Sequence, residues 1–212
     1  MYIGHYAAAA ALLAIVPDAA VAPIAVGVAW PDLVWPVLVL TRREHVTVSP
    51  NDPLQRSIRF DSYPFSHSLI LSNLFALVPA AIVAVVYGSV LPGVLFWVAA
   101  LSHWVLDLVV HIHDLPIVGF GGGDLKVGFA LWQHPRTAFV AEYLFFAAAV
   151  LMCARPSMYA GVLAGGLLLH ALNANSFFGF TKHNPVGTAN RYAMLTLVGY
   201  LCAITWFMLA WR

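Results

Sequence analysis

The chain has 212 residues, of which 62% are hydrophobic and only 9% are charged, whereas soluble domains carry about 25% charged residues. This balance excludes a soluble globular protein and predicts one integral membrane domain over residues 1–212. The formal net charge of +1 argues against a nucleic-acid partner, because such proteins carry a marked surplus of basic residues.

Seven apolar segments, separated by polar loops, predict an all-α fold, a polytopic transmembrane helical bundle. Residues 2–16 are short for a full span, so they either cross the membrane or form a re-entrant helix. Residues 19–40 contain prolines, which membrane helices tolerate where neighbouring helices or a cavity satisfy the freed backbone groups. The other expected spans cover about 66–88, 92–112, 137–153, 158–174 and 192–211.

The basic residues indicate an orientation in the membrane. With seven crossings, the loops 41–64, 113–135 and 175–191 lie on one side. Together with Arg136, which directly follows the second loop, they account for eight of the ten Lys and Arg residues. The positive-inside rule makes that side cytoplasmic. We therefore expect a multi-pass protein of the bacterial cytoplasmic membrane, with its N-terminus inside. A re-entrant first helix would move only the N-terminus to the other side.

Residues 100–114 carry several ionisable side chains at the end of an apolar run, and we expect the whole stretch to be helical. At roughly 100° per residue, His103, Asp107, His111 and Asp114 fall within about 80° of one another, while His113 points elsewhere. Ionisable groups inside a bilayer are costly unless they are paired, hydrated or bound to a metal. The pattern therefore indicates either a shared cation or a hydrogen bond that only joins two helices.

Further ionisable residues lie at a similar depth on other apolar segments. His5, Asp32 and His67 all belong to the half of the membrane that holds Asp107 in the expected topology. Random placement would not favour this arrangement. We expect His5, Asp32, His67, His103 and Asp107 to form one metal coordination sphere, or two adjacent ones.

Four short motifs follow one another between residues 1 and 115: Gly4-His5, Pro31-Asp32-Leu33, Ser66-His67-Ser68-Leu69 and Ser102-His103 followed by Asp107. Their order resembles the bacterial YdjM-like family, described as membrane-bound metal-dependent hydrolases. It is more distantly similar to zinc-dependent phospholipases C. The resemblance implies that the histidines and aspartates of these motifs are metal ligands.

Two motifs depart from the family pattern. YdjM-like sequences often have a second acid and a histidine where this chain has Val34 and Trp35, and they often have a histidine upstream of the position of His67. The implied ligand set is therefore limited to five residues, and a full multi-metal cluster is not implied.

A metal held by three or four such ligands would leave a position for water and lower the pKa of that water. Tetrahedral His and Asp ligation favours zinc, although iron or manganese fits nearly as well. His111 has the right helical phase but lies outside the family motifs, and we expect it to relay protons as a catalytic residue. The expected substrate is an ester or phosphoester of an amphipathic or lipid molecule at the cytoplasmic face.

Three other functions compete with hydrolysis. A transporter or permease would use the same cluster to carry protons or metal ions. A structural subunit would use it only to join helices, and a di-iron oxygenase would need histidine boxes that the chain lacks. The glycine-rich run 119–124 lacks the Gly-Lys-Ser/Thr ending of a phosphate-binding loop, so we expect a mobile loop over the site. The sequence sets no oligomeric state.

Overall fold

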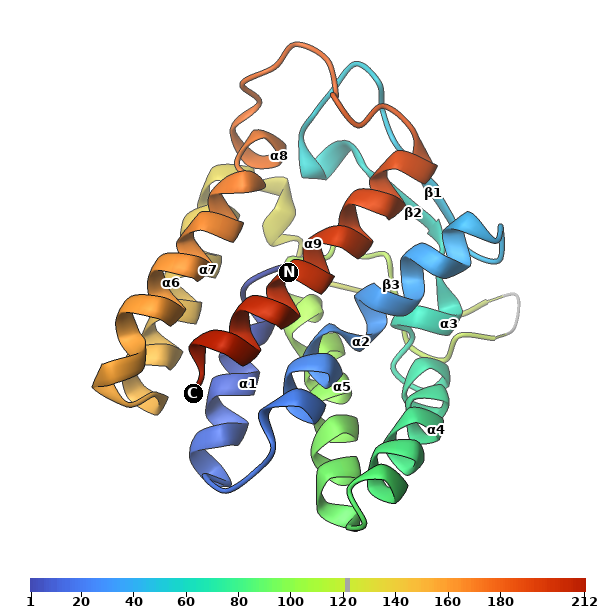
Figure 1. The fold of residues 1–212 in the computed structure, drawn as a ribbon. Coiled ribbons are helices and arrows are strands. Elements are labelled where there is room, and N and C mark those ends of the chain that lie inside the picture. Colours follow the sequence, from blue (N-terminus) through green and yellow to red (C-terminus); the bar gives the residue numbers. More distant parts are fainter. Residues whose placement is uncertain (121–122) are drawn as a thin grey trace.

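The computed structural model describes residues 1–120 and 123–212, and most of these residues are helical (Figure 1). Each expected apolar segment contains one helix: α1 (His5–Ile15), α2 (Val21–Leu40), α4 (Leu71–Val86), α5 (Val90–Val110), α6 (Pro135–Cys153), α7 (Tyr159–Leu172) and α9 (Ala189–Ala210). Among the described residues, α2, α5, α6 and α9 are long and apolar enough to cross a membrane, while the other three helices are shorter. The expected class, a mostly helical protein with membrane-length apolar helices, is confirmed.

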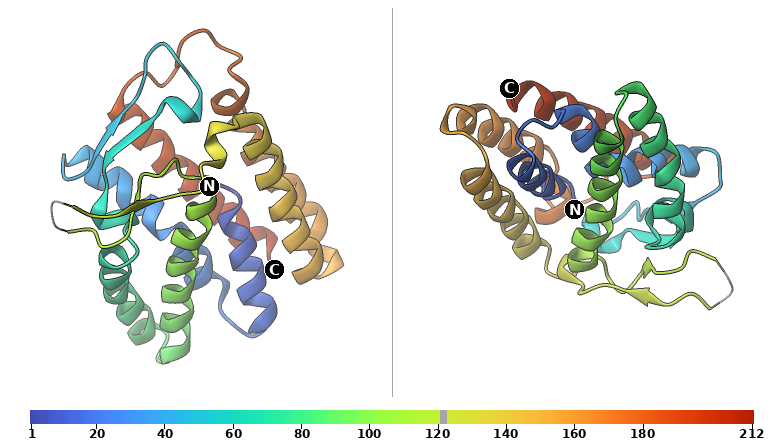
Figure 2. Two further views of the ribbon diagram at one scale, coloured as in Figure 1. Left: turned by 180° about the vertical axis from the view of Figure 1, so that it is seen from behind. Right: turned by 90° about the horizontal axis from the view of Figure 1, so that it is seen from below.

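Helix α1 has only 11 residues, which corresponds to a length of about 16 Å, or roughly half of the hydrocarbon core of a bilayer. Its first residue lies in the interior, and the N-terminus is near the middle of the molecule in the views of Figures 1 and 2. The segment therefore begins inside the molecule, at the level of the candidate site.

The long connections contain short elements, and most of them lie at the upper end of the bundle in Figure 1. The turns that join α1 to α2, α4 to α5 and α6 to α7 lie at the opposite end. Two small antiparallel sheets pair β1 (His45–Thr47) with β2 (Arg59–Ser62) and β3 (Leu115–Pro116) with β4 (Lys126–Val127). The remaining elements are α3 (Pro64–His67), α8 (Asn175–Phe178) and three single 3₁₀ turns, η1 (Gln55–Ser57), η2 (Leu131–Gln133) and η3 (Pro156–Met158).

Helices α2 and α5 pack closely, and this contact positions the candidate site. A Cβ atom on Gly27 of α2 would lie 2.6 Å from the carbonyl oxygen of Phe96 and 2.8 Å from Cβ of Ala99 on α5. Only glycine allows the backbones to approach this closely. Asp32 follows Gly27 by little more than one turn, and His103 follows Ala99 by one turn, so both reach the same level.

The expected continuous helix through Asp114 is wrong, because α5 ends at Val110 and His111 has extended backbone angles (φ −64°, ψ 145°). The segment after β4 takes the place of the next helical turn. Phe129 donates its backbone N–H to the carbonyl of Leu108 at 2.7 Å, and Ala130 donates to that of His111 at 2.8 Å. His111, whose backbone N–H still bonds to the carbonyl of Asp107 at 3.0 Å, keeps its expected helical position at the end of α5. Asp114 does not reach the site by helical phase.

The expected span from residue 66 also begins later than predicted. His67 belongs to the separate helix α3, and the chain is extended at Ser68 (ψ 146°) before α4 starts at Leu71. The expected mobile loop at 119–124 includes residues 121–122, which lie outside the described residues.

Candidate metal centre

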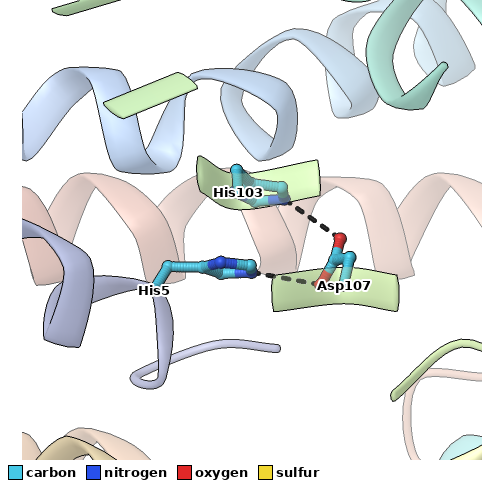
Figure 3. A group of neighbouring side chains, drawn as sticks. All are labelled: His5, His103 and Asp107. Carbon is cyan, nitrogen blue, oxygen red and sulfur yellow. Dashed lines mark ion pairs between the residues drawn. The ribbon is translucent and has the colours of Figure 1, made fainter. Parts of the chain in front are cut away.

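The five residues predicted as metal ligands lie together, and Asp107 is at their centre. Its Oδ1 atom is 3.2 Å from Nε2 of His5, and its Oδ2 atom is 3.2 Å from Nε2 of His103 and 3.8 Å from Nε2 of His67. Figure 3 shows His5 and His103 directed at this carboxylate. Side chains from α1, α3 and α5 therefore converge on one group.

Asp32 of α2 forms the second acidic centre. Its carboxylate oxygens are 3.4 Å from Nε2 of His67 and 3.5 Å from Nε2 of His103. Two groups of candidate ligands result, and within each the ligand atoms are within 4.8 Å of one another: His5, His103 and Asp107, and Asp32, His67 and His103. They share His103, so the geometry has room for one cation or two adjacent ones.

Three members of the cluster are almost completely buried. His5 and His103 are fully buried, and Asp107 is 1% exposed. Within the described part of the chain, both ring nitrogens of His5 and Nε2 of His103 have no hydrogen-bond partner. Buried polar atoms normally have partners, because leaving them unpaired costs free energy. A metal ion between the histidines and the carboxylates would satisfy the two Nε2 atoms, which face Asp107, but not Nδ1 of His5.

The tautomer of His103 is set by the backbone of α2. Its Nδ1 atom lies 2.7 Å from the carbonyl oxygen of Val28. A carbonyl can only accept, so Nδ1 must carry the proton and donate it. In the neutral ring Nε2 then has a lone pair, and it faces Asp32 and Asp107. This is the arrangement in which metal-binding histidines are usually held.

A buried chain of hydrogen bonds sets the tautomer of His67 in the same way. The Ser66 hydroxyl donates to Oε2 of Glu44 at 2.6 Å, so its oxygen accepts from Nδ1 of His67 at 2.8 Å. Oε1 of Glu44 also accepts the backbone N–H groups of Phe65 and Ser66. Burial raises the pKa of the Glu44 carboxyl above its usual value, although the bonds from Ser66 oppose this shift. Sequence analysis missed Glu44, which lies in a polar loop like many surface acids.

His111, the predicted proton relay, lies at the edge of the cluster. Its Nε2 atom is 3.6 Å from Oδ2 of Asp107. Its Nδ1 atom is 2.9 Å from Oδ1 of Asp114 and 3.2 Å from the hydroxyl of Tyr63. Burial raises the pKa of Tyr63, so this hydroxyl stays protonated at neutral pH. His111 thus connects Asp107 to the carboxylate of Asp114, which can exchange protons with it, while the Tyr63 hydroxyl serves only as a hydrogen-bond partner.

Two further polar groups were missed by sequence analysis. The amino group of Met1 pairs with Asp107, and the buried carboxylate of Glu142 on α6 accepts the backbone N–H groups of Tyr2 at 2.5 Å and Gly4 at 2.9 Å. Glu142 thereby holds the segment that leads to His5. Glu142 is the only acid in the apolar segment 137–153, and an isolated acid in such a segment could have indicated a buried polar contact.

Three further histidines, His113, His134 and His170, lie apart from the cluster. His113 and His134 are exposed. His170 is buried on α7, where its Nε2 atom lies 2.9 Å from the carbonyl oxygen of Phe139.

A cavity of about 280 Å³ reaches the cluster. At its polar end it is lined by Asp32, His67, Asp107, His111 and Glu142. A substrate in this cavity would therefore meet both carboxylates and the expected relay. The chain matches no family model, no curated protein and no solved structure.

Proposed function

We propose that this protein is a membrane-embedded metal-dependent hydrolase that cleaves an ester or phosphoester of an amphipathic substrate. The observation that carries the proposal is the orientation of the two histidines His67 and His103. Each has its Nδ1 proton engaged by a separate acceptor and directs Nε2 at the carboxylates of Asp32 and Asp107. A hydrogen bond that only joins two helices would not require this arrangement at both histidines. The ordered resemblance to YdjM-like hydrolases supports the same conclusion.

The metal we propose is zinc, because three nitrogen and two carboxylate ligands suit it better than magnesium. A bound zinc ion would supply a water of lowered pKa and polarise the scissile bond. Asp32, Asp107 and the three histidines would hold the ion, and His111 would pass a proton between the cavity and Asp114. The burial of His5, His103 and Asp107 strengthens these electrostatic interactions, since little water screens them.

We further propose that the protein crosses the bacterial cytoplasmic membrane with seven apolar segments. The surplus of Lys and Arg in the loops 41–64, 113–135 and 175–191 supports a cytoplasmic location for them. The cluster then opens toward the cytoplasmic half of the bilayer, where ester and phosphate groups of lipids reside.

The test is metal-dependent turnover. Protein stripped with a chelator should not hydrolyse fluorogenic single-chain esters or phosphodiesters, and zinc should restore hydrolysis. His103→Ala should stay inactive, whereas His170→Ala, which removes a buried histidine outside the cluster, should keep its activity. Equal turnover with and without zinc would refute the proposal.

A second candidate is transport of protons or metal ions. It is favoured by Glu142, an extra buried acid that lines the cavity but belongs to neither ligand group. Acids inside membrane proteins often mark ion pathways. Flux in sealed vesicles that Glu142→Gln abolishes, without hydrolysis of any probe, would support this function instead.

A further inference from the structure

The cavity at the cluster continues into an apolar groove between α7 and α9. Asp107 and His111 lie at one end of it. The walls toward the other end come from α7 and α9, and their apolar side chains are Leu169, Leu172, Leu195, Val198 and Cys202. A polar end joined to an apolar passage is the shape that an amphipathic molecule requires.

The groove exists because α7 and α9 touch at one end and separate at the other (Figure 1). At the closed end, Trp206 donates its indole N–H to the carbonyl oxygen of Gly161 at 3.1 Å. A Cβ on Gly165 would lie only 2.0 Å from Nε1 of Trp206, so only glycine permits this contact. Toward Leu172 and Leu195 the helices diverge, and both side chains line the groove.

The edges of the groove are apolar and exposed. Leu172 is 75% exposed, Leu195 57% and Val198 51%. Helix α9 is long and apolar enough to cross a membrane. In the membrane orientation proposed above, these exposed apolar side chains face lipid chains, and the groove opens sideways into the bilayer.

We propose that this groove binds one hydrocarbon chain of the substrate, which enters from the membrane between α7 and α9. The head of the molecule then lies at Asp32 and Asp107, and only this placement of the head rests on the proposed hydrolase function. The cavity of about 280 Å³ is at the lower end of the usual range for ligand sites, roughly 300–1,000 Å³. It therefore suits a head and part of a single chain, with the remainder in the bilayer.

The experiment uses the full chain in lipid nanodiscs and an alkyl phosphonate with a photoreactive diazirine in its chain. This probe cannot be hydrolysed. After irradiation, mass spectrometry maps the labelled residues. We expect labels on Leu169, Leu172, Leu195 and Cys202, and we expect an unlabelled alkyl phosphonate of equal length to compete for them.

Two matched variants sharpen the test. Val198 and Leu201 are both 51% exposed on α9, but only Val198 lines the groove. Val198→Trp should lower labelling of the groove by about tenfold or more, the smallest effect expected when an apolar pocket loses its fit. Leu201→Trp should leave labelling unchanged.

The outcomes test the proposed hydrocarbon-binding groove independently of the proposed hydrolase function. Labels spread evenly over lipid-facing residues such as Ile82, or equal effects of the two tryptophan variants, would overturn the groove even if zinc-dependent hydrolysis were found. Competed labelling within the groove supports it, even if no zinc binds and no probe is hydrolysed.

Discussion

His5 and His103 stack face to face, with ring centroids 3.6 Å apart and planes inclined by only 8°. Each directs Nε2 at a different oxygen of Asp107, at 3.2 Å in both cases. Two imidazolium cations at this distance would repel each other strongly, so at least one ring is neutral. A neutral imidazole beside a carboxylate can act as a metal ligand, so the geometry of this pair is compatible with a bound cation.

The first prediction concerns metal content. Purified wild-type protein should contain at least one transition metal ion per chain. His103→Ala or Asp107→Ala should contain almost none, because His103 belongs to both ligand groups and Asp107 contacts three of the histidines. Elemental analysis by mass spectrometry measures this. His170→Ala is the control and should retain its metal. A wild-type content near zero would contradict the prediction.

The second prediction concerns the relay behind His67. Glu44→Gln should weaken metal binding by about 10- to 100-fold, the usual effect of changing a group that orients a metal ligand. The amide N–H of Gln would donate to the Ser66 oxygen, so the Ser66 hydroxyl would donate to Nδ1 of His67 instead of accepting from it. The ring proton of His67 would then lie on Nε2, which could no longer bind the metal. Competition with a zinc-selective dye measures the affinity. Asp61→Asn is the control, since Asp61 is exposed and accepts from Thr47 on the neighbouring strand. Equal losses for both variants would contradict the relay.

The third prediction concerns pH. Burial raises the pKa of Glu44 above its usual 4.5, so the folded state binds this proton more tightly than the unfolded state. The resulting stabilisation is complete below pH 4.5 and is lost as the pH rises through the raised pKa. In thermal unfolding of the metal-free protein, the melting temperature of wild type should therefore exceed that of Glu44→Gln by less and less as the pH rises. A difference that stays constant with pH would contradict this assignment.

The fourth prediction concerns the contact between α2 and α5. Gly27→Ala should lower the free energy of unfolding by about 1–3 kcal/mol, because the new Cβ would overlap the carbonyl of Phe96. It should also weaken metal binding, since Asp32 would move away from His103. Gly161→Ala is the matched control, because its Cβ would lie 3.6 Å from Ala210, an ordinary contact. Equal thermal stability of the two variants would be evidence against this close packing.

The fifth prediction concerns topology. Cysteines introduced next to Arg56, Lys126 and Lys182 in a chain without native cysteines should resist a membrane-impermeant reagent applied to intact cells. A cysteine at Ser157, in the exposed turn between α6 and α7, should react. Reaction at the first three sites and protection at Ser157 would invert the orientation and place the cluster toward the outer face.

Local sequence features determined the helices. Each apolar run contains one helix, because a run of apolar residues can satisfy its backbone only internally once it leaves water. The identity of the five clustered residues was also accessible, since isolated ionisable groups in apolar segments are costly and must find partners. These inferences needed only the composition of each segment and the order of the motifs.

Tertiary structure decided how the residues meet. The distance between Asp32 and His103 depends on the close contact at Gly27, which no local pattern reveals. The end of α5 at Val110 depends on hydrogen bonds from residues about 20 positions later, which compete with the next helical turn. The role of Glu44 depends on a loop that folds back over α3. Such features arise from contacts between segments distant in the chain, so they follow from the packing of the whole chain and not from any one segment.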